Sequence, residues 1–467
     1  MKGDGPVQVK KPRLVIAAAS SGTGKTTIVT GLLAALREKG LNVQSFKIGP
    51  DYIDPGFHKL ASGKPSHNLD SWLVPEKLLP QVFMQEAKDA DISIIEGVMG
   101  LYDGGRNGVS ATASIAKTLA APVILVLNCK SAGESIAATA LGFVEYDRSV
   151  DIKGVILNNL GSKSHGELVR EAVEKIGLKV LGEIIRNTDI SLPERHLGLT
   201  PVEEQVLSEK INKIKETVAA SIDIEAICSI ANTAPSLEQE SDKATPVASK
   251  VKIGIAMDEA FSFYYQTSLD VLKEMGGELV PFSPLKDDRL PVVDGLLFGG
   301  GFPEMFAGQL AQNSLMLDAI KTAAQENMPI YAECGGFMYL AKSLTNFDGD
   351  KFSMVGIIPG NSAMQSKLQT VGYVRVKALR DSILLGEGES LQGHEFHFSS
   401  FTPDNEKDFP WAFEFEKMRT GSTYPGGYAI DSILASYLHM NFLGNRSAAE
   451  KFIKKCIDYK ANRSGSR

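Results

Sequence analysis

The sequence has few cysteines, no long hydrophobic run and no excess of positive charge. Its four cysteines are scattered over 467 residues, and such usage is typical of a reduced, cytoplasmic protein rather than of a metal site or a disulfide framework. The apolar run after the basic start ends at SSGTGKTT and is too short for a signal peptide or a membrane helix. The formal net charge of -7 argues against a nucleic-acid partner, since phosphate binding needs a basic face.

Length and composition indicate two globular domains. A chain of 467 residues exceeds one ordinary domain. Its 43% of hydrophobic and 22% of charged residues are usual for proteins with a sizeable core. A polar stretch with prolines and no periodicity separates two patterned regions and is typical of a linker. The sequence therefore predicts a domain over residues 1–232, a linker over 233–250 and a second domain over 251–467.

Both predicted domains alternate short apolar segments with helical patterns. The strand candidates of the first are 13–19, 42–49, 91–97, 121–128 and 151–159. Those of the second are 251–258, 276–282, 294–301, 328–334, 351–360 and 433–440. Most are rich in β-branched residues and bounded by turn residues. Strands separated by helices predict parallel sheets, so we expect an α/β protein made of two doubly wound domains.

The segment ASSGTGKT at 19–26 matches the phosphate-binding loop G-x-x-x-x-G-K-[ST] except at its first position. Ala19 is acceptable there if its backbone is not left-handed. The loop's amides can converge on phosphate oxygens, its lysine supplies a charge for the β- and γ-phosphates, and its threonine hydroxyl is placed for Mg²⁺. The sequence therefore predicts binding of ATP with Mg²⁺. The expected contacts are Gly22, Thr23, Gly24, Lys25 and Thr26.

Carboxylates lie at or beyond the ends of two predicted strands. The carboxyl ends of parallel strands meet at one edge of a sheet, and Mg²⁺ prefers oxygen ligands. We therefore expect Asp51 and Glu96 to bind the metal, and Asp54 and Asp103 to contact substrate. Asp54 precedes a proline, so of these acids it is the best suited to do no more than cap a turn. Lys47, at the same strand end, either meets the γ-phosphate or stays solvated.

A cysteine lies at a predicted strand-to-helix turn in the second half. Cys334, in YAECGGFMYL, would sit at a positive helix N-terminus, which favours the thiolate. Such a thiolate can attack a carboxamide and expel ammonia if a base and an oxyanion site are present. His439 in SYLHMNF is the candidate base, and Gly300 and Gly301 in GGGFPE are the candidate oxyanion site. A buried structural cysteine is the alternative, which the flanking Glu333 and the glycines make less favourable.

GHEFHFS carries two further histidines, His394 and His397, on an expected strand or turn edge. Core packing and substrate contact are equally compatible with the pattern. Metal binding is less so, because a His-x-x-His pair without a third ligand is weak.

The order of these motifs resembles the cobyrinate a,c-diamide synthase family over residues from about 13 to 445. The segments that carry the resemblance are SSGTGKTT, FKIGPDYIDPGFH, NLDSWL, EGVMGLYDG, LPERHLGL, AFSFYY, GGGFPE, YAECGGFMYL, GHEFHFS and SYLHMNF. The first half is similar to dethiobiotin-synthetase-like P-loop enzymes. The second half is similar to class I glutamine amidotransferases of the cobyric acid type.

The resemblance implies amidation of the a and c acetate side chains of the corrinoid cobyrinate, with glutamine, ATP and Mg²⁺, in cobalamin biosynthesis. ATP would phosphorylate each carboxylate and ammonia would displace phosphate. The resemblance makes Cys334 the nucleophile, makes His439 the residue that activates it, and puts Asn158 near adenine, a role its neighbour Asn159 could share. Class I enzymes usually carry a glutamate two residues after that histidine. Here the residue is Asn441, so the third triad member is missing or comes from elsewhere.

Three other functions stay open at this point. Nickel-sirohydrochlorin a,c-diamide synthase and cobyric acid synthase are similarly built, and residues alone do not reveal the macrocycle. A ParA/MinD-like regulatory ATPase would usually have a second lysine where Ser20 stands, and would lack the cysteine-bearing half. We expect small-molecule substrates, neither nucleic acid nor membrane as partner, and a cytoplasmic location. A homodimer is left open.

Overall fold

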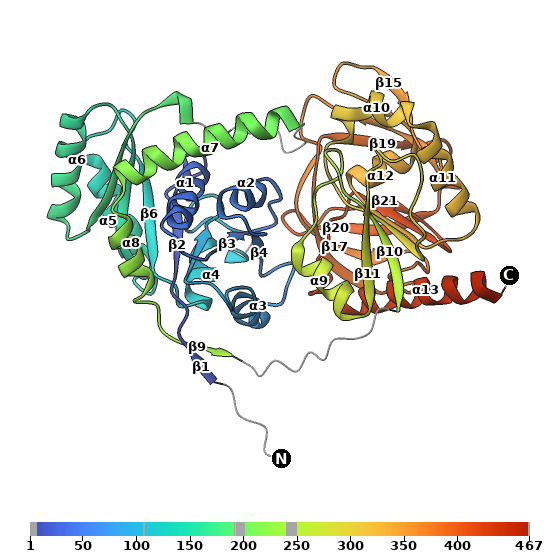
Figure 1. Ribbon diagram of the computed structural model, residues 1–467, viewed down its shortest axis with the longest axis horizontal. Helices are drawn as coiled ribbons and strands as arrows, with labels where there is room; N and C mark the ends of the chain where they lie inside the picture. Colours follow the sequence, from blue (N-terminus) through green and yellow to red (C-terminus); the bar gives the residue numbers. More distant parts are fainter. Residues whose placement is uncertain (1–6, 106–107, 191, 193–200, 240–249, 466–467) are drawn as a thin grey trace, which may run out of the picture. The chain divides into compact units, whose positions relative to one another are not determined.

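The computed structural model describes residues 7–105, 108–190, 192, 201–239 and 250–465, without the side chains of 201–206, 239 and 464–465. These residues form two compact units, one up to Gln239 and one from Lys250 (Figure 1). Each unit is described by itself. Within the described ranges, no helix has both the length and the apolar character needed to cross a membrane.

The first unit is built on a seven-stranded sheet in which every neighbouring pair is parallel. The strand order is β4 (His67–Leu69), β3 (Val43–Ile48), β5 (Ile92–Glu96), β2 (Arg13–Ala18), β6 (Val123–Asn128), β7 (Ile152–Leu160) and β8 (Val180–Ile185). Strands β3, β5 and β2 are buried along their whole length, as in sheets covered on both faces. The five predicted strands of this half are confirmed, while β4 and β8 were not predicted.

Helices cover this sheet, and a short ribbon adjoins it. The helices are α1 (Lys25–Glu38), α2 (Ile53–Ser62), η1 (Glu76–Leu78), α3 (Leu79–Glu86), α4 (Thr112–Thr118), α5 (Ser135–Tyr146), α6 (Lys163–Lys175), η3 (Thr188–Ile190), α7 (Pro201–Ser221) and α8 (Ile224–Ala231). The ribbon pairs β1 (Val7–Val9) with β9 (Leu237–Gln239). Helix α7 lies along α1 (Figure 1), where a Cβ on Gly31 would come within 2.5 Å of Val218. Glycine thus lets the two helices approach closely.

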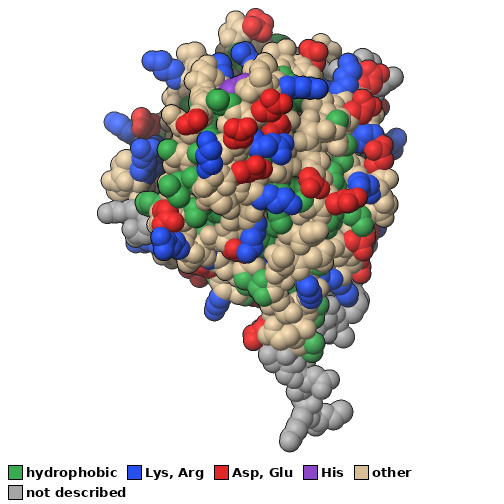
Figure 2. Space-filling view, turned by 90° about the vertical axis from the view of Figure 1, so that its left-hand side faces the viewer, with side chains coloured by type: hydrophobic (Ala, Val, Ile, Leu, Met, Phe, Trp, Pro, Cys, Tyr) green, Lys and Arg blue, Asp and Glu red, His purple; other side chains and the backbone are tan. Residues whose placement is uncertain are grey.

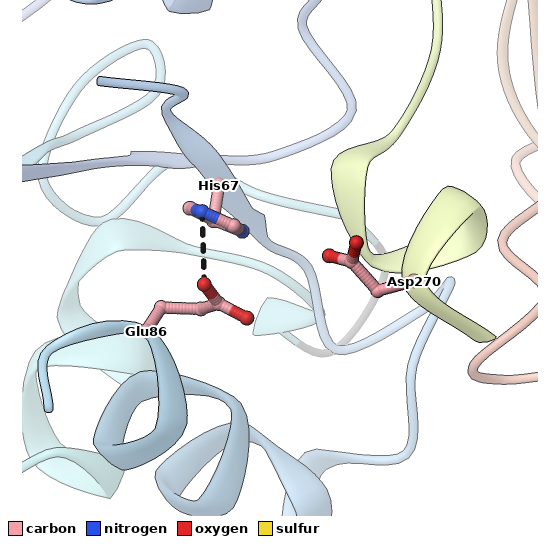
Figure 3. Close-up of side chains that lie close together, drawn as sticks. All are labelled: His67, Glu86 and Asp270. Carbon is pink, nitrogen blue, oxygen red and sulfur yellow. Dashed lines mark ion pairs between the residues drawn. The ribbon is translucent and has the colours of Figure 1, made fainter. Parts of the chain in front are cut away.

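An ion pair connects β4, an edge strand of this unit's sheet, to helix α3. His67 Nε2 of β4 lies 3.1 Å from Glu86 Oε2 at the end of α3 (Figure 3). The third side chain drawn there, Asp270, belongs to the other unit, where it accepts a hydrogen bond from Gln266.

The second unit has a nine-stranded sheet that is half parallel and half antiparallel. Its parallel half runs β11 (Gly277–Phe282), β10 (Val251–Ala256), β12 (Gly295–Phe298), β13 (Ile330–Glu333) and β22 (Ile433–Ser436). The antiparallel half continues with β21 (Thr423–Ile430), β20 (Trp411–Lys417), β17 (Thr370–Ala378) and β18 (Ser390–His397). A smaller sheet orders β15 (Lys351–Ser353), β14 (Ala341–Thr345), β16 (Ile358–Met364) and β19 (Ser399–Pro403).

The helices of this unit are α9 (Gln266–Glu274), η4 (Pro303–Phe306), α10 (Ala307–Gln312), α11 (Ser314–Gln325), α12 (Gly335–Leu340) and α13 (Arg446–Gly465). The α/β class is confirmed for both halves. The single strand predicted over 351–360 is wrong, because β15 and β16 are separated by a turn with Gly356 at φ 76°. Met354 and Val355 in that turn are buried, so their apolar character reflects burial of a turn and not a strand.

Candidate active sites

The phosphate-binding loop joins β2 to α1 and is closed by a side chain from β7. Gly24 precedes the helix at φ 91°, and a Cβ there would lie 2.5 Å from Asn158 Nδ2. That nitrogen donates to Thr23 O at 2.7 Å. The resemblance puts Asn158 near adenine; in this structure its amide holds the loop. Ala19 does not have a positive φ, so the missing first glycine of the motif does not strain the loop.

Lys25 is a buried cation at the start of α1. Its Nζ donates to Met99 O at 2.5 Å and to Ser20 O at 3.4 Å. Burial, followed by the nearby charge of Lys47, lowers the pKa of Lys25 to about 8. An anion such as a phosphate would stabilise this charge better than two carbonyl groups do.

Glu96, the last residue of β5, is the centre of a buried network. Its Oε1 accepts hydrogen bonds from Thr26 Oγ1 (2.7 Å) and Lys47 Nζ (3.0 Å). Its Oε2 lies 2.6 Å from His58 Nε2. Burial acts to raise the pKa of Glu96, but Lys47 and His58 outweigh it and hold that pKa well below its usual range. The carboxylate is therefore ionised and strongly held.

The four carboxylates expected at this edge have different partners. Asp51 Oδ1 accepts from the amides of Ile53 (2.7 Å) and Asp54 (3.3 Å) and so caps α2, while Asp54 Oδ2 pairs with Lys47 Nζ at 2.6 Å. The expectation that Asp54 would do no more than cap a turn is therefore wrong. Asp51 precedes the helix and reaches its free amides, whereas Asp54 lies inside it.

Lys47 and Asp103 also have defined partners at this edge of the sheet. The solvated alternative for Lys47 is wrong, since the residue is buried and its partners are Glu96 and Asp54. Asp103 Oδ2 accepts from Gly100 N (3.0 Å) and closes the loop after β5.

His58 was not predicted as a site residue from the sequence. It is fully buried and also contacts Ser66 Oγ at 3.2 Å. A usable signal was present, because His58 follows Asp54 by four residues on α2, and residues at that spacing share a helix face.

Thr26 and Glu96 have the geometry of neighbouring metal ligands. Their oxygens are 2.7 Å apart. In an octahedral Mg²⁺ shell with bonds of about 2.1 Å, adjacent oxygens lie about 3.0 Å apart. Both are hard oxygen donors beside the phosphate loop, so the residues present fit this ion.

In the second unit, Cys334 lies on a strained turn between β13 and α12. Its φ is 46° and its ψ -98°, which is unusual for a residue with a side chain. Its amide donates to Ser436 O of β22 at 2.7 Å. A Cβ on Gly335 would lie 2.9 Å from Pro303, and one on Gly336 2.6 Å from Phe298. The two glycines are therefore needed for close packing around the nucleophile's turn.

His439 follows β22 and bonds to Cys334. Its Nδ1 is 3.3 Å from Glu333 Oε2, and a Cβ on Gly300 would meet its Cε1 at 2.8 Å. Burial acts to lower the pKa of His439, but Cys334 and Glu333 outweigh it and raise the pKa to about 10. The imidazole is thus protonated at neutral pH.

The loop after β12 brings backbone amides to this turn. Gly301 has φ 157°, and a Cβ there would lie 2.0 Å from Ala260 O. Its nitrogen is 3.1 Å from the position a Cβ on Gly335 would take, so it borders the cysteine. The amide of Gly299 is already engaged, since it donates to Tyr264 OH at 2.8 Å. The candidate oxyanion donors Gly300 and Gly301 lie beside His439 and the cysteine's turn respectively.

Strand β18 lines the same site. His394 exchanges two backbone hydrogen bonds of 2.8 Å with His439. Burial, then the charges of His439 and His397, lowers the pKa of His394 to about 3, so His394 is neutral. His397 stacks on Tyr437 with ring centroids 3.8 Å apart. The burial of His394 makes it a core residue. For His397, both core packing and substrate contact stay open.

Two chemistries therefore share the chain: phosphate binding in one unit and attack on a carboxamide in the other. Proteins that combine them are glutamine-dependent amidotransferases driven by a nucleotide. Family models agree with this class. Residues 14–199 match the CobQ/CobB/MinD/ParA nucleotide binding domain, and residues 252–447 match the CobB/CobQ-like glutamine amidotransferase domain.

Full-length relatives narrow the class. A cobyrinate a,c-diamide synthase of Dehalococcoides mccartyi (strain CBDB1) is 44% identical over 96% of this chain and 99% of its own. One from Leptospira interrogans is 40% identical over 97% and 100%, and one from Caldanaerobacter subterraneus is 41% identical over 95% and 98%. The chain belongs to the cobyrinate a,c-diamide synthase family.

Proposed function

We propose that this protein amidates the a and c acetate carboxylates of cobyrinate in cobalamin biosynthesis, using ATP and glutamine. The observation that carries the proposal is the 44% identity with a cobyrinate a,c-diamide synthase along 96% of the chain. The nucleotide and cysteine sites described above supply the two half-reactions that such an amidation needs.

Ammonia release takes place at Cys334. Its thiolate attacks the carboxamide carbon of glutamine, and the oxyanion that forms is stabilised by the amides of Gly300 and Gly301. The imidazolium of His439 gives its proton to the departing nitrogen, which leaves as ammonia and a thioester remains. The neutral imidazole then takes a proton from water as the water attacks the thioester. Glutamate departs, and the thiolate and imidazolium are restored.

Carboxylate activation takes place in the first unit. The amides of Gly22, Thr23 and Gly24 bind ATP phosphates together with Lys25. A substrate carboxylate oxygen attacks the γ-phosphorus, ADP leaves, and ammonia then attacks the acyl carbon and expels phosphate. Lys47 reaches the transferred phosphate, where charge stabilisation is usually the largest catalytic contribution. Asn158, whose side-chain amide donates to Thr23 O in the loop, is proposed to contact adenine.

We assign Mg²⁺ to Thr26, Glu96 and Asp51. The ion would neutralise phosphate charge when bound. Asp54 and Asp103 then remain for the substrate, and Lys47 balances the carboxylates until the nucleotide arrives.

The proposed partners are therefore small molecules: a corrinoid polycarboxylate, glutamine and ATP. On the face shown in Figure 2, acidic and basic side chains of the described residues are intermixed. Such a surface suits small substrates better than a nucleic acid, which needs clustered positive charge. The few scattered cysteines favour a cytoplasmic location.

The test offers cobyrinate and nickel-sirohydrochlorin in parallel to the protein with ATP and glutamine, followed by mass spectrometry. We expect two carboxylates of cobyrinate to be converted to carboxamides. Preference for the nickel compound, or amidation of four other side chains of the corrinoid, would assign the chain to one of the sibling reactions. ATP hydrolysis without amidation of either compound would reject the proposal.

A further inference from the structure

The residue that usually completes a class I amidotransferase triad is replaced here by Asn441. Its Nδ2 donates to Thr267 Oγ1 at 2.9 Å, and its Oδ1 accepts from Leu443 N at 2.9 Å. Both ends of the amide are engaged in holding the chain after β22, and an amide carries no charge. A carboxylate for His439 must therefore come from another place in the fold.

Glu333 occupies that place. It is the last residue of β13, directly before the nucleophile, and its Oε2 lies 3.3 Å from His439 Nδ1. The side chains of Glu333 and His439 are only 11% and 3% exposed. An ion pair shielded from water to this degree is stronger than one on the surface.

Tyr331 fixes the other oxygen of this carboxylate. It lies two residues earlier on β13, hence on the same face of the strand, and its hydroxyl donates to Glu333 Oε1 at 2.6 Å. The ring of Tyr331 is itself buried, with those of Phe442 and Phe452 at 6.0 and 6.4 Å. One carboxylate oxygen is thus anchored to the core while the other faces the histidine.

We propose that Glu333, anchored by Tyr331, is the third member of the triad and positions His439 for the reaction at Cys334. The inference rests on the proposed release of ammonia from glutamine at that cysteine. Glu333 touches neither glutamine nor the reacting atoms; it orients the imidazole and stabilises its protonated form. A side chain that precedes the nucleophile thereby replaces one that would follow the histidine.

The other groups around His439 support this assignment. Cys334 faces it from the turn before α12 and His394 from β18, where the latter is neutral. From the loop after β12 the neighbour of the ring is Gly300, which has no side chain. The charges that hold the proton on His439 are therefore those of Cys334 and Glu333, so removing the latter should release that proton at a lower pH.

The test compares Glu333→Gln, Glu333→Asp and Tyr331→Phe with Asp294→Asn as a matched control. Asp294 is a buried carboxylate of the same unit that precedes β12 and pairs with Arg463, whereas Glu333 and Cys334 lie at the end of β13. Glutamine hydrolysis is followed as kcat and KM between pH 6 and 10.5, with alkylation of Cys334 by iodoacetamide over the same range. Amidation with ammonium serves as the reference for an intact fold.

For Glu333→Gln we expect kcat for glutamine to fall about 100-fold while KM changes less than about 3-fold. The alkaline limb of the kcat and alkylation profiles should move to lower pH, because the imidazolium has lost a stabilising charge. Glu333→Asp should recover part of the rate, and Tyr331→Phe should lose roughly 3- to 10-fold with a smaller shift in the same direction. Asp294→Asn should match the wild type, and amidation with ammonium should persist in every variant.

Two results would overturn the inference. One is a Glu333→Gln enzyme with wild-type kcat and an unmoved pH profile. The other is an equal loss of glutamine- and ammonium-dependent amidation, which would make Glu333 a structural residue. A wild-type protein that releases no ammonia from glutamine would instead reject the proposed function itself.

Discussion

Each unit has its site at the equivalent position of its own sheet, beyond the carboxyl ends of parallel strands. The two sites are nevertheless built by different means. In the first unit, the ionised side chains of Lys47, Glu96 and Asp54 hold one another in place. In the second, the site is shaped by backbone conformation at Cys334 and Gly301. A site for a charged nucleotide needs several charges that are balanced before the ligand binds. A nucleophile needs one atom presented at a fixed angle.

This difference predicts different sensitivities to mutation. Within the network of Lys47, Glu96 and Asp54, the remaining charged side chains can reorganise around a lost partner, so single losses there should reduce activity by degrees. A strained backbone has few alternative conformations, so adding even one methyl group beside it should cause a large loss of activity.

Lys25→Ala should abolish amidation with glutamine and with ammonium alike, a loss of at least about 1,000-fold. Activation of the carboxylate precedes both nitrogen donors. Glutamine hydrolysis alone should continue, which serves as the internal control. Near-normal amidation by this variant would mean that the loop is only structural.

Cys334→Ser should lose glutamine-dependent amidation by at least about 1,000-fold, because a hydroxyl is a far weaker nucleophile than a thiolate. Amidation with ammonium at raised pH should remain near the wild-type rate, measured by mass spectrometry of the corrinoid. Equal loss with both donors would contradict the division of labour between the units.

Gly301→Ala tests the backbone side of the comparison. The new Cβ would lie 2.0 Å from Ala260 O, a main-chain atom that cannot move alone. We expect glutamine hydrolysis to fall about 100-fold or more, because a displaced amide no longer meets the oxyanion. Gly308→Ala is the matched control, since its Cβ would make only ordinary contact with Phe352 at 3.5 Å. Wild-type hydrolysis by Gly301→Ala would show that this amide takes no part.

Glu96→Gln tests the charge network. We expect the Mg²⁺ concentration for half-maximal amidation to rise about 10-fold or more, with lower turnover and unchanged glutamine hydrolysis. Asp51→Asn should act in the same direction but more weakly, because one of its oxygens caps α2. Glu86→Gln, which removes a carboxylate paired with His67, is the control. An unchanged Mg²⁺ requirement with weaker cobyrinate binding would make these acids substrate ligands.

The smallest effect concerns stability at low pH. Because the pKa of His394 falls to about 3 on folding, the unfolded chain binds one more proton between pH 6.5 and 3. The contribution of neutral His394 to the free energy of unfolding is therefore complete above pH 6.5. It is lost as the pH falls below that value, by up to about 1.4 kcal/mol per pH unit.

The measurement is urea unfolding at pH 7.5, 6 and 5. The chain has two tryptophans, so a Trp72→Phe background leaves Trp411 to report on the second unit. Adding His394→Asn should flatten the pH dependence in this range. An unchanged slope would mean that another group takes up the proton.

The local features of both sites could be predicted from sequence, whereas contacts between distant segments could not. The phosphate loop, Cys334 and the glycines follow from short patterns with a physical requirement of their own. His58 and the anchoring of Glu333 by Tyr331 escaped, because their partners are set by strand order and side-chain packing. The antiparallel strands β17, β20 and β21 were not predicted either, since their segments lack the dense apolar runs of the parallel strands.

The left-handed turn at Cys334 also bears on how this protein could be made more heat-resistant. Backbone strain of this kind typically costs about 1–3 kcal/mol, and a glycine would relieve part of it. That exchange would remove the sulfur on which glutamine use depends. Any engineered or evolved form that tolerates higher temperature while still drawing nitrogen from glutamine must therefore gain its stability at other positions.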